Sequence, residues 1–238
     1  MEARLYVGST SKVTQGYKEV KNPFTHAVVS KFCIADAHDA HEILSVAKRA
    51  SSVAKQKPLH ERVQWLLDVA EKLEVERERI ARIMTDEVGK PITFSRIEVG
   101  RCIETIQLSA HAMMHVHGET FDTTAMPSGK KTLAFYKREP VGVVLAITPF
   151  NFPLNLVAHK IAPALVAGNT VVLKPTSQAP RTAYELVKLF IESPYATHNA
   201  LSLIYSGEGV NEALITSDIP RVISFTGSVG VGREMMQN

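Results

Sequence analysis

From residue 141 onward, short runs of continuous apolar, β-branched residues alternate with segments of helical character. These runs are VGVVLAI, TVVLK, LSLIY and RVISF. A strand that is apolar on both sides indicates a sheet covered on both faces, which is typical of parallel, doubly wound α/β folds. We therefore predict an α/β protein with a five-stranded parallel sheet that begins at Val141.

The residues before position 120 have a different pattern, which predicts helices. Across residues 60–90, apolar side chains recur at three- and four-residue steps, and Gly89 and Pro91 are typical of a helix end. Two further helices are expected over residues 39–54 and 94–116. Residues 121–131 are rich in Thr, Ser, Pro and Gly and predict a loop, and residues 132–138 predict a strand.

Composition excludes several classes of function. The formal net charge of +3 is too small to indicate a nucleic-acid-binding protein. The chain contains no apolar run near the roughly 18 residues of a membrane-spanning helix, and its first residues do not resemble a secretory signal. Two cysteines, Cys33 and Cys102, cannot build a disulfide framework, so we expect buried thiols and the reducing cytoplasm.

Parallel sheets bind ligands at the carboxyl ends of their strands, so the residues after each apolar run are candidate site residues. They are Thr148, Pro149, Phe150 and Asn151, then Lys174, Thr176 and Ser177, then Gly207 and Gly209, then Phe225, Thr226, Gly227 and Ser228. The cluster SFTGSVGVG at the last strand end suits a phosphate at a helix N-terminus. Each feature has a structural alternative: a tight turn, an Asn bonded to its own backbone, or a solvated lysine. Four such features at successive strand ends favour a ligand site.

Two other patterns are weaker. His111, His115 and His117 share helical spacing, but no cysteine or carboxylate completes a zinc site, so we expect no metal. The spacing of Gly227, Gly230 and Gly232 matches neither the dinucleotide fingerprint nor the P-loop. Arg233 also occupies the P-loop lysine position, which disfavours a phosphotransferase.

The motifs PFNFP, HKIAPALVAGNTVVLKP and SFTGSVGVG, with GKP and REPVGVV earlier in the chain, resemble the aldehyde dehydrogenase superfamily. The resemblance covers nearly the whole chain and implies NAD(P)-dependent oxidation of small aldehydes to acids through a cysteine thioester. It implies that Asn151 contributes to the oxyanion hole and that Lys160 lies buried near the site. The implied cofactor contacts are Thr148, Pro149, Phe150, Lys174, Thr176, Ser177, Gly207, Gly209, Phe225, Thr226, Gly227, Ser228 and Gly232.

The resemblance also implies a domain organisation. Residues 1–120 correspond to the helical part of the cofactor domain, 121–139 to the start of an interdomain and oligomerisation ribbon, and 140–238 to the Rossmann-like NAD(P)-binding part. The nucleophilic cysteine and general-base glutamate of the family lie beyond the glycine turn, so the catalytic domain is absent here. We expect this chain alone to be inactive, and the longer parent enzyme to be a homodimer or homotetramer.

Cofactor choice and three other functions remain open at this stage. The family often places glutamate at the position of Ser177, where it disfavours NADP, so serine predicts that NADP binds at least as well as NAD. The alternatives are a noncatalytic nucleotide-binding or interaction module, an acyl-phosphate reductase on the same scaffold, and the disfavoured P-loop phosphotransferase.

Overall fold

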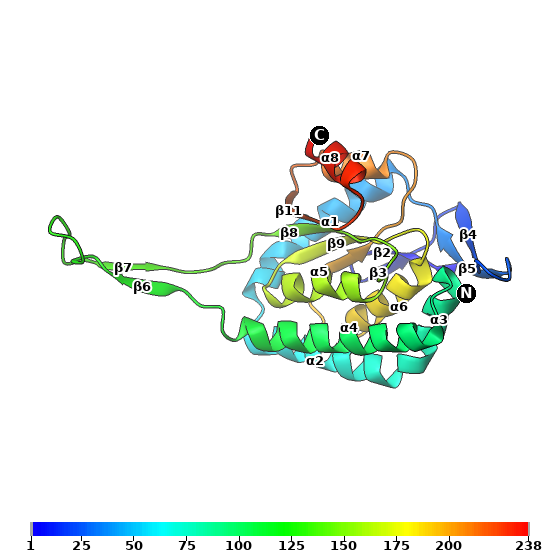
Figure 1. Ribbon diagram of the computed structural model, residues 1–238. Coiled ribbons are helices and arrows are strands. Elements are labelled where there is room, and N and C mark those ends of the chain that lie inside the picture. Colours follow the sequence, from blue (N-terminus) through cyan, green and yellow to red (C-terminus); the bar gives the residue numbers. More distant parts are fainter. Residues whose placement is uncertain (1, 238) are drawn as a thin grey trace.

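A six-stranded mixed sheet forms the centre of the computed structural model, which describes residues 2–237 (Figure 1). Its strand order is β11-β8-β9-β10-β2-β3. The first four strands are parallel, and β2 and β3 are antiparallel to their neighbours. The bounds are β2 Leu5–Val7, β3 Thr10–Lys12, β8 Val143–Ile147, β9 Thr170–Lys174, β10 Leu201–Leu203 and β11 Pro220–Phe225. The α/β class is confirmed, whereas the expected five parallel strands are four, with an antiparallel hairpin at the edge.

Helices cover both faces of this sheet. Helices α1 (Ala37–Gln56) and α7 (Val210–Ile215) pack on one face, and α5 (Asn155–Val166) and α6 (Pro180–Ile191) pack on the other. Outside α5 and α6 lies a further layer of α2 (Leu59–Val75), α3 (Arg77–Val88) and α4 (Ile92–Met113) (Figure 1). Burying β8 and β9 between two helical layers explains why both strands are continuously apolar.

The helix expected over residues 60–90 is two helices, α2 and α3, which meet at Glu76. Between Leu73 and Ile80, no side chain is fully buried, and Val75 is 85% exposed. Without core contacts across this charged stretch, nothing in the packing favours one continuous helix, and each half turns its apolar face toward the core separately. The other two predicted helices are present as α1 and α4.

Residues 2–33 are strands rather than helices. Besides β2 and β3, β1 (Glu2–Ala3), β4 (Tyr17–Lys21) and β5 (Val28–Cys33) form a separate three-stranded sheet that packs against α6. These strands are two to six residues long, and their short length explains why the sequence pattern did not reveal them.

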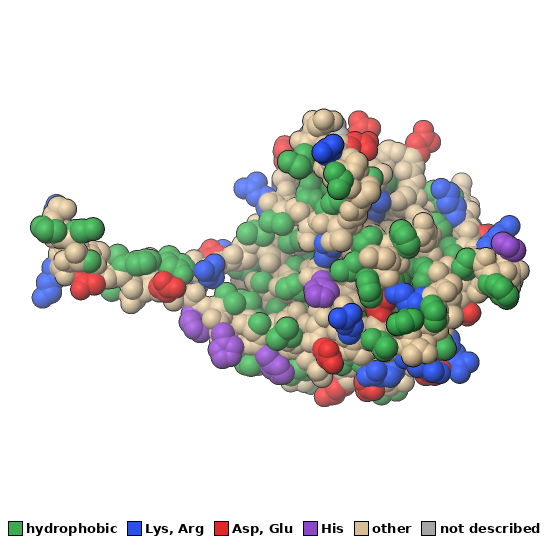
Figure 2. All heavy atoms as spheres, in the orientation of Figure 1, with side chains coloured by type: hydrophobic (Ala, Val, Ile, Leu, Met, Phe, Trp, Pro, Cys, Tyr) green, Lys and Arg blue, Asp and Glu red, His purple; other side chains and the backbone are tan. Residues whose placement is uncertain are grey.

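An antiparallel arm projects from the body and is made of β6 (Glu119–Asp122) and β7 (Leu133–Tyr136) (Figure 1). The strand expected over residues 132–138 is therefore present as β7. The first two residues of the loop expected over 121–131 belong to β6, and the loop itself begins at residue 123. Hydrophobic side chains gather along the arm (Figure 2), and Leu133 is 80% exposed. Helix α8 (Val229–Gln237) ends the described chain, and none of the helices within residues 2–237 is long and apolar enough to span a membrane.

Candidate functional site

The carboxyl ends of β8, β9 and β11 meet at one edge of the sheet. The ladder continues one residue past the strands, because the Thr148 amide donates to the Lys174 carbonyl at 3.3 Å and the Thr226 amide donates to the Ile147 carbonyl at 3.1 Å. Parallel pairing in register therefore brings candidate residues together that are up to about 80 positions apart in sequence.

These residues surround a cavity of about 460 Å³, which we call the strand-end hollow. It is lined by Ile147, Thr148, Pro149, Phe150, Asn151, Thr176, Phe225, Thr226, Gly227, Ser228 and Val231. Most of the residues singled out from the sequence thus line one space, as binding at the strand ends requires.

A second cavity of about 330 Å³, the helix-side hollow, adjoins the first, because Ile147 and Val231 line both. Of the predicted residues, it contains Lys174. Its other lining residues come from α7, from the Thr216 C-cap of that helix and from α8, and are Asn211, Glu212, Ile215, Thr216, Glu234 and Met235. These residues were not predicted from the sequence, because they lie one or more helical turns beyond the positions that directly follow each strand.

The glycine turn joins β11 to α8. A Cβ atom on Gly227 would lie 2.5 Å from the Phe225 ring, so only glycine fits there without displacing that ring. The Ser228 hydroxyl accepts a hydrogen bond from the Val231 amide at 3.4 Å, which caps the helix. The turn therefore places the N-terminus of a nine-residue helix beside the strand-end hollow.

Three polar groups at these hollows are left available for a ligand. The Thr148 hydroxyl is buried and has no hydrogen-bond partner within residues 2–237. Burial lowers the pKa of the Lys174 ammonium, for which the described chain provides no ion pair. The Asn151 carboxamide makes no hydrogen bond to described residues, so the alternative of an Asn bonded to its own backbone is not what the structure shows.

Other predicted residues lie outside both hollows. Lys160 on α5 donates to the Ser224 hydroxyl at 3.1 Å, and burial lowers its pKa. Gly207 packs against the segment between β5 and α1, since a Cβ there would lie 1.6 Å from the Ala35 carbonyl oxygen. Gly209 begins α7 with a φ of 68°. Ser177 and Gly232 contribute to neither lining.

Asn151 also borders a third cavity, of about 630 Å³, which we call the apolar hollow. Its other lining residues are Val88, Lys90, Pro91, Phe94, Ile97, Glu98, Arg101, Phe150 and Phe152. Asn151 and Phe150 therefore stand between the strand-end hollow on one side and a largely hydrophobic space on the other.

Neither cysteine borders these cavities. Cys33 and Cys102 are both fully buried, and burial raises the pKa of the Cys102 thiol well above its ordinary value. A buried, protonated thiol is a poor nucleophile. The structure thus agrees with reading both residues as small core side chains.

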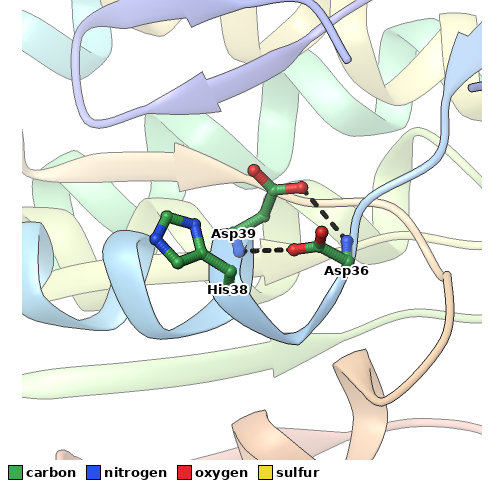
Figure 3. A group of neighbouring side chains, drawn as sticks. All are labelled: Asp36, His38 and Asp39. Carbon is green, nitrogen blue, oxygen red and sulfur yellow. Dashed lines mark hydrogen bonds between the residues drawn. The ribbon is translucent and has the colours of Figure 1, made fainter. Parts of the chain in front are cut away.

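One group of potential metal ligands within residues 2–237 is Asp36, His38 and Asp39 (Figure 3). Asp36 is the N-cap of α1: its carboxylate accepts from the Asp39 amide at 2.9 Å, and Asp39 accepts from the Asp36 amide at 3.1 Å. Asp39 also pairs with Lys12 at 2.7 Å. This reciprocal capping accounts for the cluster without a metal. The three histidines His111, His115 and His117 are exposed at the end of α4 and beyond it.

Comparison with known proteins gives consistent matches. The chain is 38% identical over 219 residues to a lactaldehyde dehydrogenase of Methanocaldococcus jannaschii, a match that covers 90% of this chain and 46% of that protein. It is 37% identical over 228 residues to a 3-sulfolactaldehyde dehydrogenase of Priestia megaterium, covering 96% and 47%. The chain thus spans about half the length of the curated relatives it matches.

Solved structures agree in fold. The NADP-dependent glyceraldehyde-3-phosphate dehydrogenase of Bacillus halodurans, solved with NADP, superimposes with a TM-score of 0.95 at 30% identity. The match covers 100% of this chain and 50% of that one. The model of the aldehyde dehydrogenase family matches residues 10–238. The motifs, the fold and these matches together show that the chain belongs to the aldehyde dehydrogenase family.

Proposed function

We propose that this chain is the cofactor-binding half of an NAD(P)-dependent aldehyde dehydrogenase that oxidises a small aldehyde to a carboxylic acid. The observation that carries the proposal is the position of Asn151. Its unpartnered carboxamide lies between the strand-end hollow and the apolar hollow. A cofactor in the first space and an aldehyde in the second would meet at this residue.

The residues of the strand-end hollow fit a nicotinamide dinucleotide. The buried Thr148 hydroxyl has no hydrogen-bond partner among residues 2–237, and a bound ligand would provide one. Gly227, Ser228 and the α8 N-terminus would hold the pyrophosphate, because exposed amides and the helix dipole favour an anion. Lys174, in the adjoining helix-side hollow, would bind the adenosine ribose or its phosphate. The bound nicotinamide would supply the hydride acceptor of the reaction.

Asn151 is proposed to stabilise negative charge on the aldehyde oxygen. A side-chain amide donates hydrogen bonds to an oxyanion, and a donor fixed in advance in a site with little water is more effective than solvent. Since no described residue accepts from this amide, both of its N–H groups are available. The aromatic side chains Phe150 and Phe152 line the apolar hollow and would exclude water around the carbonyl.

The longer enzyme is proposed to be a homodimer or homotetramer. The arm formed by β6 and β7 supports this, because it extends away from the body and exposes Phe121, Leu133 and Phe135. An isolated two-stranded ribbon is unstable in water unless another surface covers it. NADP is proposed to bind at least as well as NAD, since Ser177 introduces no negative charge.

Calorimetric titration of NADP and NAD into the 238-residue chain tests the proposal. Gly227→Ala should weaken binding about tenfold or more, because its methyl group displaces the Phe225 ring. Gly230→Ala in the same glycine cluster is the matched control, since its Cβ meets no atom within 4 Å. Absence of binding, or equal affinity in both variants and the original chain, would contradict the proposed site.

A further inference from the structure

Lys90 makes three contacts with the turn that carries Asn151 and with its surroundings. It follows the α3 C-cap, and its ammonium donates to the Asn151 backbone carbonyl at 2.7 Å. The same ammonium forms an ion pair with Glu98 and lies 4.5 Å from the centroid of the Phe152 ring. The Lys90 ammonium therefore contacts both the main chain of Asn151 and the side chain of Phe152.

Glu98 holds the other end of the same turn. This residue lies on α4, and its side chain is 1% exposed. One carboxylate oxygen accepts from the Leu154 amide at 2.9 Å and from the Asn155 amide at 3.1 Å, while the other contacts Lys90. Leu154 and Asn155 begin α5, whose N-cap residue makes no side-chain hydrogen bond. Glu98 thus caps a helix on which it does not lie.

The two contacts bracket Asn151 in the chain. Its carbonyl is held on one side, and the amides three and four residues later are held on the other. The carboxamide has no hydrogen bond to described residues, so its direction depends on the backbone that carries it. A donor must lie about 2.7–3.1 Å from the developing oxyanion, and small displacements are costly.

We propose that Lys90 and Glu98 are positioning residues, an ion pair that fixes the backbone of the Asn151 turn and thereby aims the Asn151 carboxamide at the substrate oxygen. The role in aiming the amide rests on the function proposed above. The contacts of Lys90 and Glu98 with the Asn151 turn do not depend on that function, since they lie within this chain. Neither residue is expected to touch the reacting atoms.

The contacts distinguish this role from that of an ordinary stabilising ion pair. The pair of Lys72 and Asp68, in contrast, joins neighbouring turns of one helix. Lys90 instead reaches the backbone of a residue 61 positions away, and Glu98 reaches amides 56 and 57 positions away. Both partners are largely withdrawn from water, with exposed side-chain fractions of 16% and 1%. Shielding strengthens each charged hydrogen bond.

The test uses the purified 238-residue chain without nucleotide. The chain is labelled with nitrogen-15 asparagine, so that NMR detects the pair of proton resonances from each side-chain amide. The pair that disappears in Asn151→Asp belongs to Asn151. Hydrogen exchange is measured in parallel on the backbone amides of Phe152 and of residues 154–156, since Pro153 has no amide proton. The variants are Lys90→Met, which keeps the apolar stem but removes the donors, Lys90→Arg, which restores charge and donors, and Glu98→Gln. Lys72→Met is the matched control.

In Lys90→Met, the Asn151 side-chain resonances should move away from their original positions, because the backbone that carries the carboxamide is no longer held by the Lys90 ammonium. In Glu98→Gln, the Leu154 and Asn155 amides should exchange at least tenfold faster, because a neutral amide is a weaker acceptor. Lys90→Arg should retain the original resonances, and Lys72→Met should change nothing in this turn. Exchange in α1 and β9 should stay slow in all variants.

Unchanged resonances in Lys90→Met together with unchanged exchange in Glu98→Gln would overturn the proposal. Faster exchange throughout α1 and β9 would also overturn it, because Lys90 would then support the whole fold. Failure of Lys90→Arg to retain the resonances would show that packing, and not charged hydrogen bonding, holds the turn. None of these measurements involves a nucleotide, so they are independent of the titrations that test the proposed function.

Discussion

Lys174 places a positive charge at the end of a buried strand without an ion pair in the described chain. Burial lowers the pKa of this ammonium, so folding brings a charged group into an unfavourable environment. We expect Lys174→Met to raise the urea midpoint of the nucleotide-free chain and to weaken NADP binding about tenfold, the usual size of one charged hydrogen bond. Denaturation and calorimetry measure the two effects, with Lys72→Met on α2, outside both hollows, as control. Lower stability together with unchanged affinity would contradict the assignment.

The same residue predicts a pH dependence. Because burial lowers the folded-state pKa of Lys174 below its unfolded value near 10.5, the folded state binds this proton less tightly than the unfolded state does. The penalty is complete below the folded pKa and disappears as pH rises toward the unfolded pKa. The stability of the original chain relative to Lys174→Met should therefore increase on the alkaline side. Parallel stability curves for the two proteins would rule this out.

Ser177 is the residue from which cofactor choice is predicted. A serine hydroxyl does not repel the extra phosphate of NADP and can donate to it, whereas a glutamate would face that phosphate with a negative charge. We expect NADP to bind at least as tightly as NAD, and Ser177→Glu to shift the preference toward NAD. Titration of both nucleotides measures this, with Ser52→Glu at an exposed position of α1 as control. A strong NAD preference in the original chain would show that Ser177 does not contact the nucleotide.

At the level of helices, Glu87 joins α3 to the start of α6 and to β5. Its buried carboxylate accepts from the Arg181 and Thr182 amides at 2.9 and 2.8 Å, and from the hydroxyls of Thr182 and Ser30 at 2.7 and 2.6 Å. Replacing it with glutamine turns an amide group toward these donors. We expect Glu87→Gln to lower the free energy of unfolding by about 3 kcal/mol.

Urea denaturation measures this loss, and Glu78→Gln provides a control on the same helix. Glu78 is exposed and pairs with Arg82 and Arg96 on the surface, so its substitution should leave the midpoint nearly unchanged. Equal effects of the two substitutions would show that the contacts of Glu87 do not stabilise the α6 N-terminus.

Helices and strands with a clear pattern of apolar residues were predictable from the sequence, and short strands were not. Helix α4 and the strands β8 and β9 appear close to their expected bounds, because each has enough apolar residues to define its buried side. The break between α2 and α3 was missed, because Leu73 and Ile80 lie two helical turns apart and fit one helix face, whereas no side chain between them is buried. The strands β1 to β5 were missed because two to six residues show no clear alternation.

For the whole molecule, we expect the 238-residue chain to oxidise no aldehyde. Both of its cysteines are buried in the core, away from the hollows that surround Asn151. Mixing the chain with NADP and a small aldehyde should give no absorbance of reduced cofactor. A thiol reagent should label neither cysteine until the protein is unfolded. Turnover that persists in both Cys33→Ala and Cys102→Ala would require a different nucleophile and contradict the proposed chemistry.

Local pattern by itself determined the class of this fold and the edge of the sheet where the candidate site lies. Continuous apolar strands require cover on both faces, and turn residues must follow each strand. Both features therefore depend on residues that are adjacent in the sequence. Tertiary structure alone decided which residues face each other across the chain. It placed β2 antiparallel beside β10, added α7 and α8 to the helix-side hollow, and brought Lys90 and Glu98 to the Asn151 turn. Such contacts join residues more than 50 positions apart, and no local period records them.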